Sequence, residues 1–257
     1  MAHVGTLGWS RNTGGRLSAR DRTELVGLAA KTVVADGPNF LAYRLGLQRR
    51  FPEAKGLARL SAPVTPAARH ARSSLCEIAP PYMVNHSLRT YWFSRLLADD
   101  SRILLDDEND ELLYLASLAH DVGLFLPCSP GTSNASCFSI RGAEWASEIA
   151  RQAGWKAGRR NCLEETITLN LNGRVPAHLG VEAHLMMRGV LLDVTGMYAW
   201  RVNPIDVEEV FALTPLLDQR QRLWPLFRDE ARRHPKCRGH FAVCWLGFGF
   251  LMRHSPW

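Results

Sequence analysis

Apolar residues recur along this chain at intervals of three and four positions, the spacing that places them on one face of an α-helix. The clearest case is residues 85–97, where Asn85 can cap a helix. The buried face of that helix would carry Leu88, Tyr91, Trp92, Leu96 and Leu97. No segment shows the sustained strict alternation of a half-buried strand. The sequence therefore predicts an all-α fold.

Residues that begin or end helices mark several further elements. Glycine or Asn-Gly closes the helices predicted at residues 111–120, 142–153, 163–171 and 181–194. Asn203-Pro204 predicts another helix start, because asparagine can cap and proline needs no N–H there. Residues 127–137 are predicted to form a loop.

The chain is predicted to consist of one core domain with two extensions. Residues 1–80 form an N-terminal arm and helical extension, in which a helix is expected after Ser18. A Pro-, Ala-, Arg- and Ser-rich connector is expected at residues 63–81. Residues 81–200 form the core, and residues 201–257 form a C-terminal helical segment packed on it.

Charge and hydropathy limit the partners of the protein. Hydrophobic residues make up 46% of the 257 residues, and the net charge of +6 includes no long basic run. This pattern disfavours nucleic-acid binding, although arginines converging on one cleft would suit an anionic substrate. No export signal begins the chain, and its longest apolar stretch, residues 241–252, is too short to cross a bilayer. We expect a cytoplasmic protein without a membrane partner.

The six cysteines are widely spaced and include no C-x-x-C pair. They are Cys76, Cys128, Cys137, Cys162, Cys237 and Cys244. Neither a zinc ribbon nor a disulfide framework is indicated, so we expect reduced thiols that pack in the fold. Cys137 is the first choice among them for a place at a pocket.

The adjacent pair His120-Asp121 ends a predicted apolar helix, although aspartate is a poor helix former and is seldom buried without a partner. A metal ion would supply that partner, because imidazole nitrogen and carboxylate oxygen bind zinc, manganese or iron. A solvated aspartate is the alternative for the pair alone. Asp193 similarly interrupts an apolar run at residues 190–194, and His86 opens its own helix. A shared cation would offset the cost of burying these charges.

Five short segments, in this order, carry a resemblance to a known family. They are NHSLRTY (85–91), LAHDVGL (118–124), FSIRGA (138–143), EA (182–183) and LDVTG (192–196). With these segments the chain resembles the HD-domain superfamily of metal-dependent hydrolases, and it is similar to the cyanamide hydratase-like branch. The resemblance implies an HD-domain helical bundle, here with added N- and C-terminal helices.

The resemblance also implies a ligand set and a cofactor. His86, His120, Asp121 and Asp193 would hold one divalent transition metal ion, with zinc favoured and iron or manganese as alternatives. His120 and Asp121 would also be catalytic. The metal would lower the pKa of a bound water and polarise the group under attack.

Arg89 lies one helical turn after His86 and is a candidate catalytic and substrate-binding residue. Its guanidinium could hold a phosphate or a polarised substrate, and a surface ion pair is the alternative. Arg141 is the best candidate for a second basic residue near the metal.

Three more residues are candidates for contact with the substrate: Asn170, His184 and Phe138. Many relatives carry histidine where Asn170 stands, which implies an amide that hydrogen-bonds water or substrate. His184 lies on much the same side of its helix as Asp193, with a satisfied core or surface histidine as the alternative. His178 and His184 do not reproduce a dinuclear arrangement, so one metal ion is implied. Phe138 belongs to an aromatic set that is mainly core and could also wall the pocket.

Three functions are compatible with these sequence features. The first is an enzyme that activates water for attack on a small polar molecule, as in nitrile or cyanamide hydration. The second is a phosphomonoester or nucleotide phosphohydrolase, for which the positive charge and Arg89 give mild support. The third is a degenerate fold acting as a binding or regulatory module, which would require the loss of a metal ligand. The partner is a small-molecule substrate, and a homo-oligomer is compatible with the sequence.

Overall fold

The computed structural model describes residues 3–126 and 137–257. Within these two segments the chain forms α-helices and short 3-10 helices but no β-strand, apart from one isolated bridge between Arg16 and Cys237. The all-α prediction is confirmed. Except for Cys137, the loop predicted at residues 127–137 lies outside the described residues, and so does Cys128.

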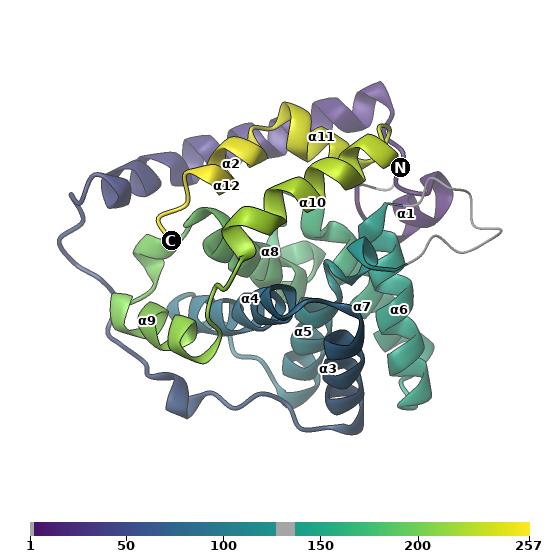
Figure 1. Cartoon of the computed structure of the whole chain (residues 1–257), viewed down its shortest axis with the longest axis horizontal. Helices are drawn as coiled ribbons and strands as arrows, with labels where there is room; N and C mark the ends of the chain where they lie inside the picture. The colour runs from purple at the N-terminus through teal and green to yellow at the C-terminus, as the bar shows by residue number, and fades with distance from the viewer. Residues whose placement is uncertain (1–2, 127–136) are drawn as a thin grey trace.

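The central bundle is formed by α3 to α8 (Figure 1). These helices are α3 (Pro66–Ile78), α4 (Pro81–Asp100), α5 (Asp107–Ala119), α6 (Phe138–Gln152), α7 (Ala157–Leu169) and α8 (Val181–Thr195). A continuous core of buried apolar side chains joins all of them, and α4 packs along α8 near its centre. The candidate site described below lies at this contact.

The two ends of the chain supply the remaining helices. These are α1 (Leu7–Thr13), α2 (Ala19–Arg44), α9 (Pro204–Leu213), α10 (Gln219–Arg233), α11 (Arg238–Trp245) and α12 (Phe248–Arg253). Short 3-10 helices are η1 (Leu57–Arg59), η2 (Val122–Leu124), η3 (Asn170–Asn172), η4 (Ala177–Leu179) and η5 (Ala199–Arg201). In Figure 1, α2, α10, α11 and α12 run across one side of the bundle. The N- and C-terminal segments therefore cover the same face.

Two predicted helix starts are confirmed by their caps. Ser18 Oγ accepts a hydrogen bond from the backbone N–H of Asp21 at 3.2 Å, and Asp21 Oδ2 accepts one from the backbone N–H of Ser18 at 2.8 Å. Asn203 Oδ1 accepts from the backbone N–H of Ile205 at 2.9 Å, with Pro204 at the first helical position. No helix in the described segments combines the length and apolar character of a membrane span.

Two other predictions were wrong because prolines start helices at these positions. α4 begins at Pro81, which suits a first helical position, so Asn85 lies inside the helix and its Nδ2 donates to the carbonyl oxygen of Pro215 at 2.8 Å. In place of a connector at residues 63–81, Thr65 caps α3 and Pro66 opens it. The small apolar face of α3 packs in the core. This packing stabilises the helix although few of its residues are apolar.

The contact between α4 and α8 depends on Gly189. A Cβ atom at this position would lie 2.5 Å from the carbonyl oxygen of Thr90 and closer still to Ser94 Oγ. Because main-chain atoms of α4 cannot turn aside as a side chain can, any larger residue would push the two helices apart.

We therefore expect Gly189→Ala to lower the free energy of unfolding by about 1–3 kcal/mol, measured by guanidinium denaturation. Gly27→Ala, in α2, is the matched control, because its added Cβ meets no atom within 4 Å. The control should be neutral or stabilising by about 0.5–1 kcal/mol. Equal stability of the two variants would argue against the close approach of α4 and α8.

Candidate metal centre

Four buried polar side chains meet where α4, α5 and α8 converge. His86 lies on α4, His120 is the C-cap of α5, Asp121 is the next residue, and Asp193 lies in the last turn of α8. Each is at most 2% exposed. The structure thus brings together the four residues that the sequence singled out, although they come from three separate helices.

Three of the four direct a donor atom toward one point. His86 Nε2 lies 3.1 Å from His120 Nε2, and Asp121 Oδ2 lies 3.4 Å from each of them. Atoms bound at about 2.0–2.2 Å to a single ion stand roughly 3.0–3.6 Å apart. This is the only group of three such residues found in the described part of the chain.

Hydrogen bonds on the far side of each ring determine which nitrogen carries the proton. His86 Nδ1 lies 2.6 Å from Asp193 Oδ2, and His120 Nδ1 lies 2.8 Å from the carbonyl oxygen of Ser117. A carboxylate and a carbonyl only accept, so both Nδ1 atoms must donate. In the neutral rings the Nε2 atoms therefore turn lone pairs toward each other and toward Asp121. Three converging acceptors repel unless a cation lies among them, so these residues fit a bound metal ion.

The buried charges shift the acid–base properties of the group. Burial alone would lower the pKa of His86, but its hydrogen bonds to Asp121 and Asp193 outweigh burial and raise that pKa to about 9. Burial would raise the pKa of Asp121, yet His120 and His86 hold it well below its usual range. Without a metal, a proton on His86 would therefore be the cation shared by the group.

Asp193 plays a different part from the other three in this structure. Its Oδ2 accepts from His86 Nδ1, and its Oδ1 accepts from Arg89 Nε at 2.5 Å. Gln219 Nε2 also donates to Oδ2, at 3.2 Å. The carboxylate therefore lies behind His86 and orients its ring. Asp193 is not part of the group whose donor atoms lie within 4.8 Å of one another, so its direct coordination of a metal stays a prediction.

Arg89 is fully buried, and all five of its N–H groups have partners. Besides Asp193, its guanidinium donates to the carbonyl oxygens of Thr214, at 2.6 Å, and Pro215, and to Gln219 Oε1. The expectation that Arg89 binds substrate or acts in catalysis does not fit this arrangement. Its guanidinium instead joins α4 to α8 and to the segment before α10.

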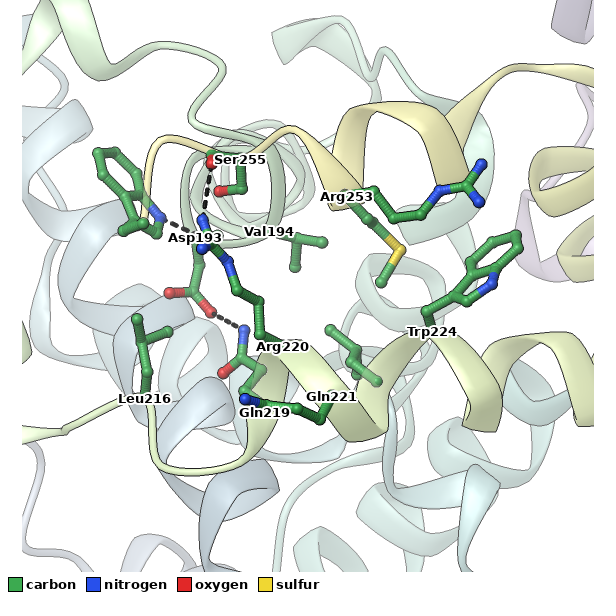
Figure 2. Close-up of a pocket in the computed structure, with 12 residues that line it drawn as sticks. Asp193, Val194, Leu216, Gln219, Arg220, Gln221, Trp224, Arg253 and Ser255 are labelled. Carbon is green, nitrogen blue, oxygen red and sulfur yellow. Dashed lines mark hydrogen bonds between the residues drawn. The ribbon is translucent and has the colours of Figure 1, made fainter.

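Two cavities adjoin these residues. The first, of about 260 Å³, lies beside Asp193 and contains Gln219, Arg220, Trp224 and Arg253 (Figure 2). Gln219 bonds the Asp193 carboxylate there, and the Trp257 indole N–H donates to the Asp193 carbonyl oxygen at 2.8 Å. None of the three converging donors is among its described lining residues.

The second cavity, of about 130 Å³, is lined by His86, Asp121 and Asn170 together with many apolar side chains. Asn170 is 4% exposed and is the C-cap of α7, and its Oδ1 has no hydrogen-bond partner in the described structure. A buried carbonyl oxygen without a partner is costly and is satisfied by a water or a ligand. Asn170 therefore offers an acceptor at the cavity wall, and substrate contact by Asn170 stays a prediction.

The other candidates for substrate contact lie elsewhere. His184 faces a separate cavity and hydrogen-bonds the carbonyl oxygen of Val175 at 2.6 Å, and burial lowers its pKa. Phe138 is fully buried edge-on to Phe227, and it is Phe227 that lines the cavity at the donors. These two placements do not support substrate contact by His184 or Phe138, because neither is among the described residues that line the cavity at the donors.

Arg141 and Cys137 also have structural partners. Arg141 donates to the carbonyl oxygen of Gly123, at 2.8 and 3.0 Å, and to Glu230 at 2.9 Å. It therefore holds the turn that follows Asp121 against α6 and α10. Cys137 is buried beside Cys237, away from both cavities described above. The structure shows the described cysteines as thiols without disulfides.

Several residues at the site were missed by sequence reasoning. Gln219 and Trp257 bond Asp193, and Phe227 lines the cavity, yet all three lie in the C-terminal segment. Glutamine, tryptophan and phenylalanine are ordinary residues of amphipathic helices, so no local pattern distinguishes them. Their role arises from the way α10 and the chain end fold back over α8.

Residues 83–154 match the model of one protein family, described as HD domain. The matched segment contains His86 and His120-Asp121 and ends before Asp193. With the all-α bundle, the match supports a place in the HD-domain superfamily, whose members are generally metal-dependent hydrolases. The match does not distinguish the cyanamide hydratase-like branch from other branches of the superfamily. No curated protein matches the chain.

We expect Asp121→Ala to lose bound metal, because it removes one of the three converging donors and leaves two repelling imidazoles. Metal content by elemental analysis should fall from about one ion per chain to below a tenth. Asp107→Ala, an exposed carboxylate in the first turn of α5, is the matched control and should keep its metal. Equal metal content in the two variants would contradict the ligand assignment.

Zinc binding should release a proton from His86. Its pKa of about 9 exceeds the ordinary value of 6.5, so the protonated ring stabilises the metal-free fold fully below pH 6.5, and this stabilisation is lost as pH rises through 9. Zinc must displace that proton, so affinity should rise with pH up to about 9. Calorimetry at pH 7 in buffers of different ionisation enthalpy should show release of about one proton per zinc. Zinc uptake without proton release would refute this protonation state.

Proposed function

We propose that this protein is a metal-dependent enzyme that adds water to a small neutral substrate, in the manner of nitrile or cyanamide hydration. His86, His120 and Asp121 would hold one divalent transition metal ion. Zinc is favoured because two imidazoles and a carboxylate suit it, and iron or manganese would bind similar donors. The observation that carries the proposal is the convergence of three buried acceptors beside a cavity.

A bound metal would lower the pKa of a water molecule and polarise the substrate group under attack. The side chains of the protein would prepare the site for that chemistry. Asp193 and the Ser117 carbonyl hold the two imidazole rings with their Nε2 atoms toward each other and toward Asp121. Asp121 lines the same cavity, where its carboxylate can accept a hydrogen bond from an entering water. Asn170 Oδ1 offers a second acceptor at the cavity wall.

The surroundings of the donors favour a neutral substrate over a phosphate. No lysine or arginine is among the described residues that line the donor cavity, and Arg89 and Arg141 are bound to other parts of the protein. A phosphoryl group normally requires such cations to balance its charge. Hydration of a nitrile, R–C≡N + H₂O → R–C(O)NH₂, develops no comparable charge on the substrate.

Phosphomonoester or nucleotide hydrolysis is the second candidate. One observation favours it: Arg220 and Arg253 line the cavity beside Asp193 shown in Figure 2. The three donors do not line that cavity, so an anion held there would not meet a water at the metal-binding group. A purely regulatory role is a weaker candidate, because a degenerate fold would lack a metal ligand and all three donors converge here.

The test is a substrate panel on protein loaded separately with zinc, manganese and iron. Cyanamide, acetonitrile and benzonitrile would be compared with p-nitrophenyl phosphate and nucleoside monophosphates. We expect urea or amide as product, followed by NMR, and loss of at least about 100-fold in rate for Asp121→Ala. Phosphate release with no amide or urea would overturn the hydration proposal. Failure with all substrates in protein that binds no metal would favour the regulatory role.

A further inference from the structure

The cavity beside the metal-binding donors is lined by a few polar residues and by many apolar ones. Its polar residues include His86, Asp121 and Asn170, and its other walls include Met187 and Leu191 of α8. Met187 and Leu191 are buried apolar side chains, and their methyl groups form no hydrogen bonds with a polar ligand. A molecule as small and polar as cyanamide would leave most of this surface without a complementary partner.

The apolar walls come largely from outside the segment that matches the HD domain. Of the described lining residues, His86 and Asp121 alone lie within residues 83–154. Val33 of α2 and Leu251 of α12 line the cavity from the two chain extensions, and these helices lie on one side of the bundle in Figure 1. The metal donors are thus supplied by the HD segment, and the apolar walls by the two chain extensions and α8.

The cavity is open toward solvent between the two extensions. Val33 is 65% exposed, and Leu246 and Leu251 are partly exposed, although all three line the cavity. A substrate could therefore enter between α2 and α11–α12 and reach His86 and Asp121 at the inner end. The entering group would pass apolar side chains on both sides.

Cavity size bounds the group that fits. The volume of about 130 Å³ is close to the roughly 150 Å³ of an apolar protein cavity that binds benzene. Each buried methylene group contributes about fourfold to binding. An unbranched alkyl chain or a phenyl ring would thus be distinguished strongly from a methyl group.

We propose that the substrate carries an apolar substituent about the size of a phenyl or butyl group, and that Val33, Leu246 and Leu251 of the extensions select it. This inference rests on the proposed function, since the reacting group would face His86 and Asp121. It assigns a role to the extensions: together with α8 they form the specificity pocket of a metal centre whose donors lie in the HD segment.

The first measurement is a homologous series on the zinc-loaded protein: acetonitrile, propionitrile, butyronitrile, valeronitrile and benzonitrile. We expect kcat/KM to rise by about fourfold per methylene until the cavity is full. Leu251→Trp should fill part of the cavity and lower the ratio of kcat/KM for benzonitrile to that for acetonitrile by about tenfold. Val33→Trp, at a more exposed position, is a second filling variant that is easier to accommodate.

The matched control is Phe250→Trp, the neighbouring residue on α12, which is 58% exposed and is not among the lining residues. It should leave the benzonitrile ratio within about twofold of the parent. Zinc content of each variant reports whether the fold is retained. A ratio unchanged by both filling variants, or acetonitrile preferred over benzonitrile, would overturn the inference.

A binding measurement separates this inference from the proposed function. Benzene added to the Asp121→Ala protein, which cannot turn over, should bind at the cavity by saturation-transfer NMR, and Leu251→Trp should remove that signal. If benzene binds in this way but no nitrile reacts, the hydration proposal fails and the apolar pocket stands. If benzene does not bind, or binds equally to Leu251→Trp, the pocket inference fails whatever the activity.

Discussion

The carboxylate of Asp193 is the point on which the rest of the site depends. It accepts hydrogen bonds from Arg89 on α4, His86 on α4 and Gln219 on α10, and so ties three helices together. Burial would raise the pKa of the Asp193 carboxyl, but the Arg89 guanidinium beside it holds that pKa well below the usual range. Removing one partner of such a buried pair typically costs about 3–5 kcal/mol. The same bonds orient His86, so the stability of the bundle and the direction of its Nε2 have a common source.

The centre combines contributions from different parts of the chain. The segment matching the HD domain supplies His86, His120 and Asp121, whose acceptor atoms converge at 3.1 to 3.4 Å. The terminal extensions and α8 supply most of the apolar surface beside them. Because specificity depends on the shape and polarity of the whole pocket, the chemistry of the centre and the choice of substrate can vary separately. Basic side chains near the centre are bound within the protein, which limits their use for an anionic substrate.

Local patterns predicted much of the fold. Helical periodicity and the caps at Ser18 and Asn203 were sufficient for the all-α class and for several helix starts, because these depend on neighbouring residues. The expectation of a connector before α4 failed. Thr65-Pro66 starts α3 there, and its small side chains are stabilised by packing in the core, which cannot be seen in a window of sequence. For the same reason, the sequence predicted that α4 starts at Asn85, whereas the helix begins at Pro81.

The sequence by itself determined that the protein is helical and that His86, His120-Asp121 and Asp193 are the buried polar residues in need of partners, since burial of a charge in an apolar helix is costly wherever it occurs. Only the tertiary structure decided which partner each one has. In the folded protein, Asp193 lies behind His86, and every N–H group of Arg89 has a partner within the protein. Asn170 lines the cavity. These outcomes depend on the distances between helices that are far apart in the sequence. A hydrogen bond forms only at short range, and the interaction of two charges weakens as they separate.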